Sequence, residues 1–466
     1  MSTPQSELWG GAATRKKRQV KPSTTPATQK PAVVHSIGGT DPASRFYYDG
    51  RGFFMDADSL YIPLSDVASV RRQLKQAGCF GEKDICGLRP DDRALNQIQT
   101  AQFVSYAGPL AGYRRGLHTL NGGKRVLVTE SPVIPCPQAG RWQTLEAVLC
   151  GLLVDEDERQ MQTVFGWIKT AFESLKAGRY RPGQALALAG PAGCGKSLLI
   201  DLLRVILGGR SAGAYEWLSG RTNFNLSCAA AELLVVDDKA GSSDPRARAT
   251  LAANLKSGLF SGEVRIEGKH KNAFDCRPLW RLVFALNDEP ENLLVLPPLN
   301  EDVRDKITLL RCRPFTLPMP AHTLEEKAAF WQALVSEVPA FLHWLESWQI
   351  PEELREARCG VTFYHHPALV EGLQTLAPES QLWQHILDAA ESFQIQFPAK
   401  LTAAEVQRII TAPDADHCHA ARSLLNWPAA CGAYLARLAH SHPERVRKAG
   451  KLHGIERWEL LPPTTD

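Results

Sequence analysis

Apolar and polar residues alternate along the middle of the chain in two recurring patterns. Short and almost wholly apolar runs are typical of strands that lie buried in a parallel sheet. After the first of these runs, residues 198–207 carry apolar side chains at helical spacing, and Gly208 and Gly209 end the predicted helix. Strands that alternate with helices predict an α/β fold with a parallel sheet and flanking helices. The predicted strands are residues 184–189, 232–237, 280–286 and 303–310.

Weaker patterns on either side divide the rest of the chain. Residues 144–178 predict two helices that lead into the first core strand. Residues 45–64 and 103–129 predict short strands around a helix near 65–77, whereas residues 1–42 are rich in small and polar residues and predict disorder. We therefore expect a disordered basic tail (1–42), a small N-terminal α+β module (43–143), a central α/β domain (144–320), a helical region (321–395) and a C-terminal domain (396–466).

The sequence of the C-terminal domain predicts three helices followed by a basic hairpin. Thr402 and Glu405 have the spacing of a capping box, which opens the first helix. Residues 445–448 and 456–460 are expected to pair as the hairpin. This order resembles a winged helix, in which basic side chains bind phosphate without reading sequence; the alternative is a small helical oligomerisation or packing domain. The expected phosphate contacts are Arg447, Lys448 and Lys451.

Composition narrows the possible environments of the chain. The 466 residues are 44% apolar, which is ordinary for a globular protein. An apolar run of about 18 residues is needed to span a membrane, and the sequence contains none. The N-terminus lacks the apolar core of a signal peptide, and the eleven scattered cysteines fit a reducing cytoplasm. Because the net charge is only +3, any nucleic-acid surface must be local.

One motif predicts the chemistry of the central domain. The loop between the first strand and its helix fits G-x-x-x-x-G-K-[ST], in which backbone N–H groups surround phosphates at a helix N-terminus. The lysine is expected to bind the β- and γ-phosphates of ATP, and the serine hydroxyl to bind Mg²⁺. The loop residues are Gly190, Pro191, Ala192, Gly193, Cys194, Gly195, Lys196 and Ser197.

Residues at the ends of later strands complete an expected hydrolytic site. The apolar run 232–236 ends in Asp237 and Asp238; we expect Asp237 to hold Mg²⁺ and Asp238 to accept a proton from the attacking water. Asn287 follows the next strand and is expected to orient that water. Arg304 precedes the last strand, where it could neutralise transition-state charge on a neighbouring subunit's ATP; the alternative is a surface salt bridge.

A basic turn lies between the acidic strand and the asparagine strand. Residues 262–274 predict two strands around Lys269, His270 and Lys271. Consecutive cationic or titratable side chains suit contacts with the phosphates of DNA. Phe274 is expected to pack the base of this hairpin rather than stack on a nucleobase. Three other features, Asp56 with Asp58, Cys79 with Cys86, and His365 with His366, are weak metal-site patterns, for which turn chemistry or ordinary packing is the favoured interpretation.

The order of these motifs resembles the superfamily 3 helicases of viruses, phages and plasmids, and more closely the DUF5906-like phage and plasmid primase–helicase family. The resemblance covers roughly residues 100–345 and rests on residues 255–262, 282–290 and 296–299 together with the motifs above. It implies an AAA+-like ring, usually a homo-hexamer, that moves 3′→5′ on single-stranded DNA with the basic hairpin in its channel. Because no primase–polymerase domain is found upstream, a separate primase or polymerase is a candidate partner.

These features predict an ATP-dependent DNA helicase or translocase of mobile-element replication. A first alternative is an AAA+ replication initiator or remodelling ATPase without processive unwinding. A second is a regulatory protein that uses ATP as a switch, although a switch does not need the complete set of hydrolytic residues.

Overall fold

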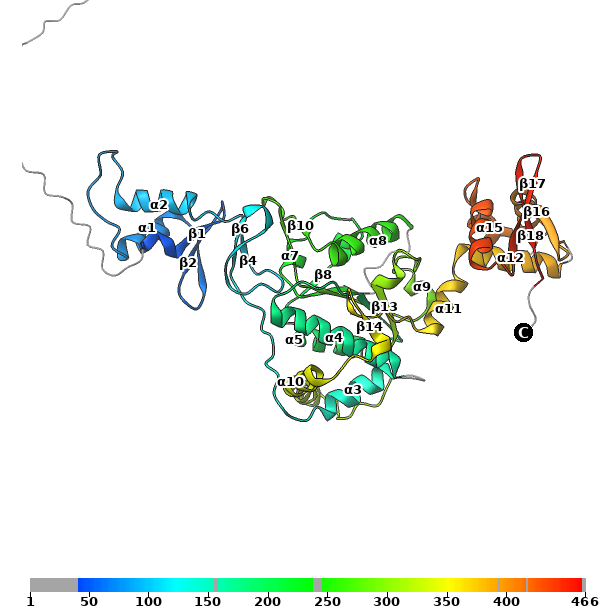
Figure 1. Ribbon diagram of the computed structural model, residues 1–466, viewed down its shortest axis with the longest axis horizontal. Helices are drawn as coiled ribbons and strands as arrows, with labels where there is room; N and C mark the ends of the chain where they lie inside the picture. The colour runs from blue at the N-terminus through cyan, green and yellow to red at the C-terminus, as the bar shows by residue number, and fades with distance from the viewer. Residues whose placement is uncertain (1–40, 155–157, 238–244, 393, 416–417, 463–466) are drawn as a thin grey trace, which may run out of the picture.

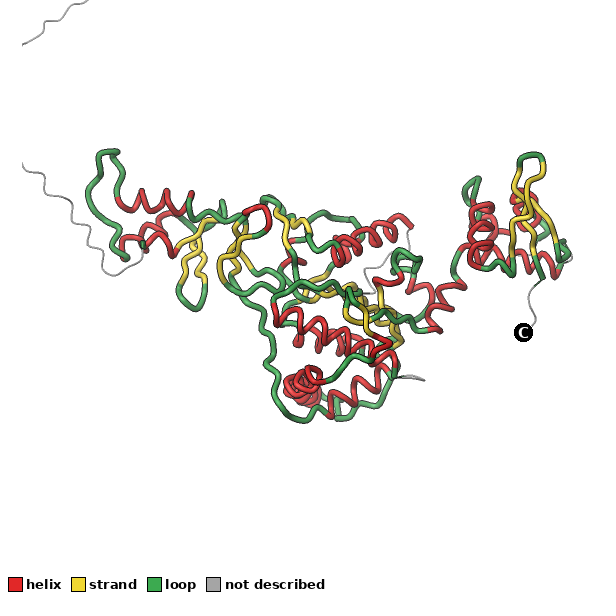
Figure 2. Tube along the Cα trace, viewed as in Figure 1, coloured by secondary structure: helices red, strands yellow, loops and turns green. Residues whose placement is uncertain are grey.

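The computed structural model describes residues 41–154, 158–237, 245–392, 394–415 and 418–462. Figure 1 shows an N-terminal part, a central part and a C-terminal part in a row, and Figure 2 shows that helices and strands are mixed in each of them. Among the described residues, no helix combines the length and the apolar character that crossing a membrane requires.

A five-stranded sheet forms the middle of the central part. Its strand order is β13-β7-β12-β9-β8, and all neighbouring pairs are parallel. Every residue of β7 and β12 is buried, which explains why both strands are apolar almost throughout. The predicted α/β fold class is therefore confirmed. The strands are β7 (Ala185–Ala189), β8 (Ser211–Gly213), β9 (Leu233–Asp237), β12 (Arg281–Leu286) and β13 (Ile307–Arg311).

Helices cover both faces of this sheet, as Figure 1 shows. Alternate residues of each strand point to opposite faces, so Leu186 and Leu188 enter one apolar core, whereas Ala187 and Phe284 enter another. The first core contains α3 (Gln143–Leu153), α4 (Arg159–Ala177), α5 (Lys196–Ile206) and α10 (Leu324–Ser347). The second contains α6 (Tyr215–Leu218), α7 (Leu226–Ala229), α8 (Pro245–Phe260) and α9 (Pro290–Leu293).

Helix α10 is continuous although it contains a proline. Pro339 lies inside it and removes one backbone N–H from the helical hydrogen bonds. Apolar side chains on both sides of the proline, including Leu334, Phe341 and Leu345, are buried in the same core. Tertiary packing of this face therefore outweighs the local cost of the proline.

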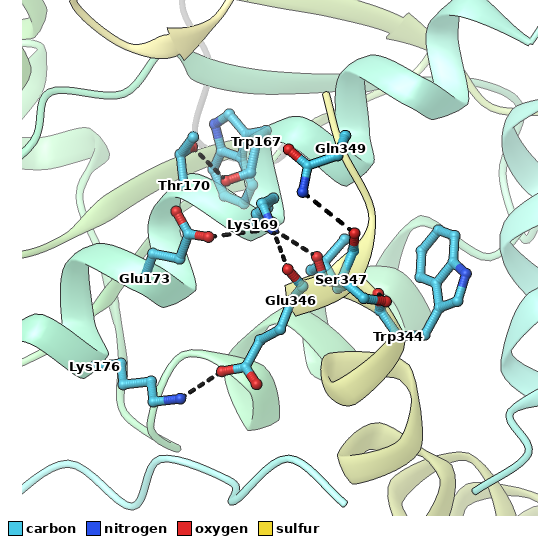
Figure 3. Close-up of polar contacts among 10 residues, drawn as sticks. Trp167, Lys169, Thr170, Glu173, Lys176, Trp344, Glu346, Ser347 and Gln349 are labelled. Carbon is cyan, nitrogen blue, oxygen red and sulfur yellow. Dashed lines mark hydrogen bonds and ion pairs between the residues drawn. The ribbon is translucent and has the colours of Figure 1, made fainter. Parts of the chain in front are cut away.

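A lysine of α4 joins the two long helices, as Figure 3 shows. The ammonium group of Lys169 donates hydrogen bonds to the carbonyl oxygens of Leu345 at 2.8 Å and Glu346 at 2.9 Å, in the last turn of α10. It also lies 3.2 Å from a carboxylate oxygen of Glu173, and its side chain is only 12% exposed. The last carbonyl groups of a helix lack partners within the helix, so this lysine supplies donors where α10 needs them.

We expect Lys169→Met to lower the free energy of unfolding by about 1.5–3 kcal/mol, because a methionine keeps the apolar stem but removes hydrogen bonds made by a charged donor. Urea denaturation, followed by intrinsic tryptophan fluorescence, measures this change. Lys176→Met is the matched control, because Lys176 pairs with Glu346 of the same helix end but is 55% exposed. If both variants unfold at the same urea concentration, Lys169 does not join the helices.

The segment that precedes the central domain also packs on its sheet. The sequence analysis placed residues 104–128 in the N-terminal module. Leu110 and Val126 of this segment lie in the second core, whereas Val104 and Leu127 lie in a small separate cluster with side chains of the N-terminal part. The N–H of Gly112 donates to Oε1 of Glu232 at 2.8 Å, and Glu232 is completely buried and also accepts from Arg210. The strands of this segment are β4 (Tyr106–Gly108), β5 (Gly116–Thr119) and β6 (Arg125–Val128).

The N-terminal part has a small core of its own, which includes Phe46, Phe53 and Leu74. Arg115 links it to the central part, because its guanidinium donates to Oδ1 of Asp56 at 2.6 Å and to the carbonyl oxygen of Asp58 at 2.7 Å. The elements are β1 (Phe46–Tyr48), β2 (Phe53–Asp56), β3 (Tyr61–Leu64), α1 (Val67–Gln76) and α2 (Pro90–Thr100).

The C-terminal part packs helices against a three-stranded antiparallel sheet of order β16-β18-β17. The capping box opens α13: the hydroxyl of Thr402 accepts from the N–H of Glu405, whose carboxylate accepts from the N–H of Thr402. The connecting elements are β14 (Arg355–Glu356), β15 (Gly360–Val361) and α11 (Pro367–Thr375). The C-terminal elements are α12 (Pro378–Glu391), β16 (Ala399–Thr402), α13 (Ala403–Ile410), α14 (Cys418–Leu424), α15 (Ala430–Ser441), β17 (Val446–Leu452) and β18 (Ile455–Leu460).

Candidate functional site

The glycine-rich loop joins the carboxyl end of β7 to the start of α5. Gly193 and Gly195 have φ values of 77° and 116°, in a region that favours glycine. A Cβ atom on Gly190 would lie 2.3 Å from the carbonyl oxygen of Cys312, so any other residue would push the loop away from β13. Burial raises the pKa of the Cys312 thiol, so the side chain of this residue, which lies against the loop, stays uncharged.

Lys196 is the first residue of α5 and lies inside the loop. It is only 9% exposed, and its ammonium group donates to the carbonyl oxygens of Gly190 at 2.6 Å and Pro191 at 3.0 Å. Ser197 follows it and is exposed. The start of the helix thus places a cation, a hydroxyl group and backbone N–H groups together, which is the donor set that phosphate groups require.

The strand order brings two further predicted residues to the same edge of the sheet. β12 lies between β7 and β9; Leu286 pairs with Ala189, and Ala285 pairs with Asp237. Asn287 follows β12 directly and therefore lies between the glycine-rich loop (190–197, called the phosphate loop below) and Asp237. Asp237 is exposed and Asn287 is partly exposed. Asp238 lies outside the described residues.

Arg304 lies at the opposite edge of the same sheet. It begins a short 3₁₀ turn (Arg304–Lys306) that precedes β13, and Ile307 pairs with Ala185, at the start of β7. The length of β7, about 13 Å at the usual rise per residue, therefore separates Arg304 from its own phosphate loop. The side chain is exposed. Within the described part of the chain it forms no ion pair.

The predicted basic hairpin is present as β10 (Val264–Ile266) and β11 (Phe274–Cys276). The N–H of Lys271 donates to the carbonyl oxygen of Gly268 at 3.0 Å and closes the turn, and His270 adopts a φ of 58°. Lys269, His270 and Lys271 are all exposed. The turn therefore presents three consecutive polar side chains to solvent.

The segment 104–128 supports this hairpin from the side. Phe274 is 2% exposed and stacks on Tyr106 with 5.1 Å between ring centroids, as expected for a residue that packs the base of the hairpin. The ammonium group of Lys271 lies 5.5 Å from the centroid of the Tyr106 ring. Lys124 donates to the carbonyl oxygen of Ala273 at 3.0 Å. The hairpin is thus held by residues that precede the glycine-rich loop by more than 60 positions.

Two consecutive residues that the sequence analysis missed, Phe224 and Asn225, lie beside this hairpin. Asn225 is 1% exposed; its side chain donates to the carbonyl oxygen of Arg265 at 2.9 Å and accepts from the N–H of Glu267 at 2.8 Å. The preceding residue, Phe224, is 51% exposed. A large exposed aromatic residue fixed beside a basic hairpin is a candidate for stacking on a base. The signal in the sequence was a polar stretch interrupted by a single aromatic residue.

Residues 188–302 match the family of unknown function DUF5906. The resemblance predicted from the sequence is confirmed over this segment. The DUF5906 segment contains the phosphate loop, Asp237, the basic hairpin and Asn287, and it ends two residues before Arg304. No curated protein matches the chain.

Some solved structures match about nine tenths of the chain, well beyond the DUF5906 segment. One apo structure of the NrS-1 C-terminal region has a TM-score of 0.53 and 12% sequence identity, and the match covers 89% of this chain and 96% of that one. A second apo structure of this region gives a TM-score of 0.53 at 13% identity, covering 90% and 96% of the two chains. At this identity the likeness establishes a shared fold. The JCV helicase matches more weakly, with a TM-score of 0.26, 16% identity, and coverage of 48% of this chain and 64% of its own.

The remaining predicted positions lie apart from the DUF5906 segment. Arg447, Lys448 and Lys451 are exposed on β17. The Nε atom of Arg447 donates to the carbonyl oxygen of Pro443 at 2.7 Å, and the ammonium group of Lys448 lies 5.9 Å from the centroid of the Trp458 ring. Over the residues that the structure describes, no cluster of three or more His, Cys, Asp or Glu side chains could hold a metal ion. Asp56 is instead paired with Arg115.

Proposed function

We propose that this protein is an ATP-dependent helicase or translocase that moves on single-stranded DNA. The observation that carries the proposal is the sheet order, which brings the phosphate loop, Asn287 and Asp237 to one edge. The exposed basic hairpin supplies a separate surface for a polyanion. An ATP-driven motor requires both a hydrolytic site and a second surface that responds to it.

In this proposal each residue of the edge has a role. Lys196 neutralises charge on the β- and γ-phosphates, and Ser197 with Asp237 holds Mg²⁺; a hydroxyl and a carboxylate oxygen are the ligand types that this hard cation prefers. Asn287 orients the attacking water, and Asp238 accepts its proton. The metal supplies charge neutralisation on the phosphate oxygens. Arg304 acts in a ring, for which we propose a homo-hexamer, on the ATP of the adjacent subunit.

The DNA surface consists of the hairpin tip and the neighbouring aromatic side chain. Lys269 and Lys271 bind phosphates of the single strand, and Phe224 stacks on a base. A separate primase or polymerase acts with the protein. ATP turnover with and without single-stranded DNA, measured beside strand displacement, tests the proposal. If DNA does not change the rate of ATP turnover and no strand is displaced, the protein is a remodelling ATPase or a switch.

Replacing Lys269 and Lys271 together by alanine is expected to leave basal ATP turnover intact, because neither side chain belongs to the phosphate site. DNA-stimulated turnover and unwinding should fall together. The slope of log affinity for single-stranded DNA against log salt concentration should become shallower by about 0.7 for each phosphate that the variant no longer binds. Fluorescence anisotropy of a labelled oligonucleotide across a salt series gives this slope.

The matched control replaces Lys176 and Lys327 by alanine. Both are exposed lysines on α4 and α10, which cover the other face of the sheet, so the change in net charge is the same. The control should keep the salt slope and the unwinding rate of the natural chain. If the hairpin variant also keeps both, the hairpin does not contact DNA.

A further inference from the structure

The C-terminal hairpin presents an unusual tip. Figure 1 shows that β17 and β18 extend beyond the helices of the C-terminal part. Leu452 and Ile455 face each other in the strand register, and His453 and Gly454 between them have φ values of 52° and 83°. Two consecutive residues with positive φ are typical of a tight two-residue hairpin turn. The turn therefore fixes the two aliphatic side chains opposite each other at the tip.

Both aliphatic side chains are open to solvent. Leu452 is 48% exposed and Ile455 is 59% exposed, whereas the apolar residues nearer the helices, Val446, Trp458 and Leu460, are buried. The fold of this part is thus complete without the pair at the tip. Hairpin tips normally carry polar residues, so an apolar pair held in place by a tight turn is a candidate contact surface.

Positive charge surrounds the apolar pair. Residues 445–457 contain five lysine and arginine residues and one glutamate. The register places Lys451 opposite Glu456, next to the tip, and places Arg447 opposite Glu459, which also lies 3.4 Å from Lys400. A second copy of this hairpin would bring like charges together. A polyanion with exposed apolar faces matches the surface better.

The two exposed hairpins of the chain share a further feature. Among the described residues, three that are not glycine have a positive φ, namely Asp58, His270 and His453. Both histidines lie at a hairpin tip within two residues of a lysine. A positive φ in a residue other than glycine raises the free energy of the backbone, and such strained residues tend to cluster at functional sites. The C-terminal tip differs from the β10–β11 tip in carrying aliphatic side chains where the other carries only polar ones.

We propose that Leu452 and Ile455 form a wedge that inserts where duplex DNA opens into single strands. The proposal rests on the helicase function proposed above. Apolar side chains that enter a base step unstack it, and the energetic cost of unstacking is offset when flanking cations bind the backbone. Lys448 and Lys451 bind the phosphates on either side of the junction. Single-stranded DNA has no base pair to open, so the ligand of the wedge is the junction between duplex and single strands.

The test uses the full chain and a forked DNA with 2-aminopurine in the base pair next to the junction, because the fluorescence of this base rises when it unstacks. Without ATP, the natural chain should raise the fluorescence at saturating protein. The double variant Leu452→Thr and Ile455→Thr should abolish at least about two thirds of this rise while it weakens fork binding less than about threefold, because the cations remain. Threonine keeps the strand propensity of both positions.

Two comparisons distinguish the effect of the wedge from the effects of the cationic side chains and of the β10–β11 hairpin. Lys448→Ala with Lys451→Ala should reduce fork affinity and flatten its salt dependence by about 0.9 in log–log slope for each duplex phosphate that the variant no longer binds. The threonine variant should keep ATP turnover stimulated by single-stranded DNA, because it leaves the β10–β11 hairpin untouched. Loss of fork unwinding with intact stimulation supports the wedge.

Three results would overturn the inference. An undiminished fluorescence rise in the threonine variant shows that the tip does not unstack the junction. An equal rise on a duplex without a fork shows that the tip does not select the junction. A threonine variant whose oligomeric state changes in analytical ultracentrifugation shows that the tip contacts another copy of the chain. A natural chain that neither hydrolyses ATP in response to DNA nor unwinds a fork instead overturns the proposed helicase function.

Discussion

Replacing Lys196 by alanine is expected to lower ATP turnover by at least about 100-fold, the usual effect of removing one preorganised electrostatic contact from a reacting group. Lys196 is 9% exposed, and its ammonium group donates to two carbonyl oxygens of its own loop. A cation in such a site interacts more strongly with phosphate than one in open water. Phosphate release measures turnover, and a fluorescent ATP analogue measures nucleotide affinity.

The fold should survive this substitution. Core contacts of α5 come from other side chains, such as Leu199 and Leu203. The melting temperature of Lys196→Ala should therefore remain near that of the natural chain. Lys196→Arg is the matched variant, because it keeps the charge but not the shape; it should also be inactive. Turnover within tenfold of the natural rate in Lys196→Ala would place hydrolysis at another site.

Replacing Arg304 by alanine is expected to lower turnover by about 1,000-fold or more, as removal of an arginine finger does. The side chain lies at the edge of the sheet opposite to its own phosphate loop, so its effect requires a neighbouring subunit. Mixing Arg304→Ala subunits with Lys196→Ala subunits should restore activity. In an equal mixture, about one in four head-to-tail interfaces combines an intact loop with an intact arginine.

The control mixture replaces the Lys196→Ala subunits by subunits that carry both substitutions. No interface in this mixture contains both groups, so activity should stay at the level of Arg304→Ala alone. Subunit exchange is verified by energy transfer between labelled chains. If exchange occurs and neither mixture recovers activity, Arg304 does not act between subunits.

Local patterns predicted the glycine-rich loop between β7 and α5, because its conformation depends on neighbouring residues. Glycine is required at Gly193 and Gly195 by their positive φ values, and the apolar run before the loop forms the buried strand β7. The hairpin tip was likewise predictable, because polar residues between two short strands form a turn wherever the strands pair. The capping box of α13 depends on two residues three positions apart, Thr402 and Glu405.

Long-range contacts account for what the sequence analysis missed. Tyr106 stacks on Phe274, and Lys124 binds the backbone of Ala273, although nothing in the local sequence of either partner indicates the other. Helix α10 continues through Pro339 because apolar side chains on both sides of the proline are buried in one core. The role of Asn225 in holding the basic hairpin depends on two backbone groups about 40 residues away.

The sequence by itself determined the buried strands and the glycine-rich loop at residues 190–197, because hydrophobic periodicity and glycine placement are encoded within a few residues of each motif. Only the tertiary structure decided how these motifs combine. The insertion of β12 between β7 and β9 brings Asn287 to the loop, and the parallel pairing of β13 with β7 places Arg304 at the far edge. Strand order is set by which buried faces and crossover connections pack together, and this balance involves the whole domain.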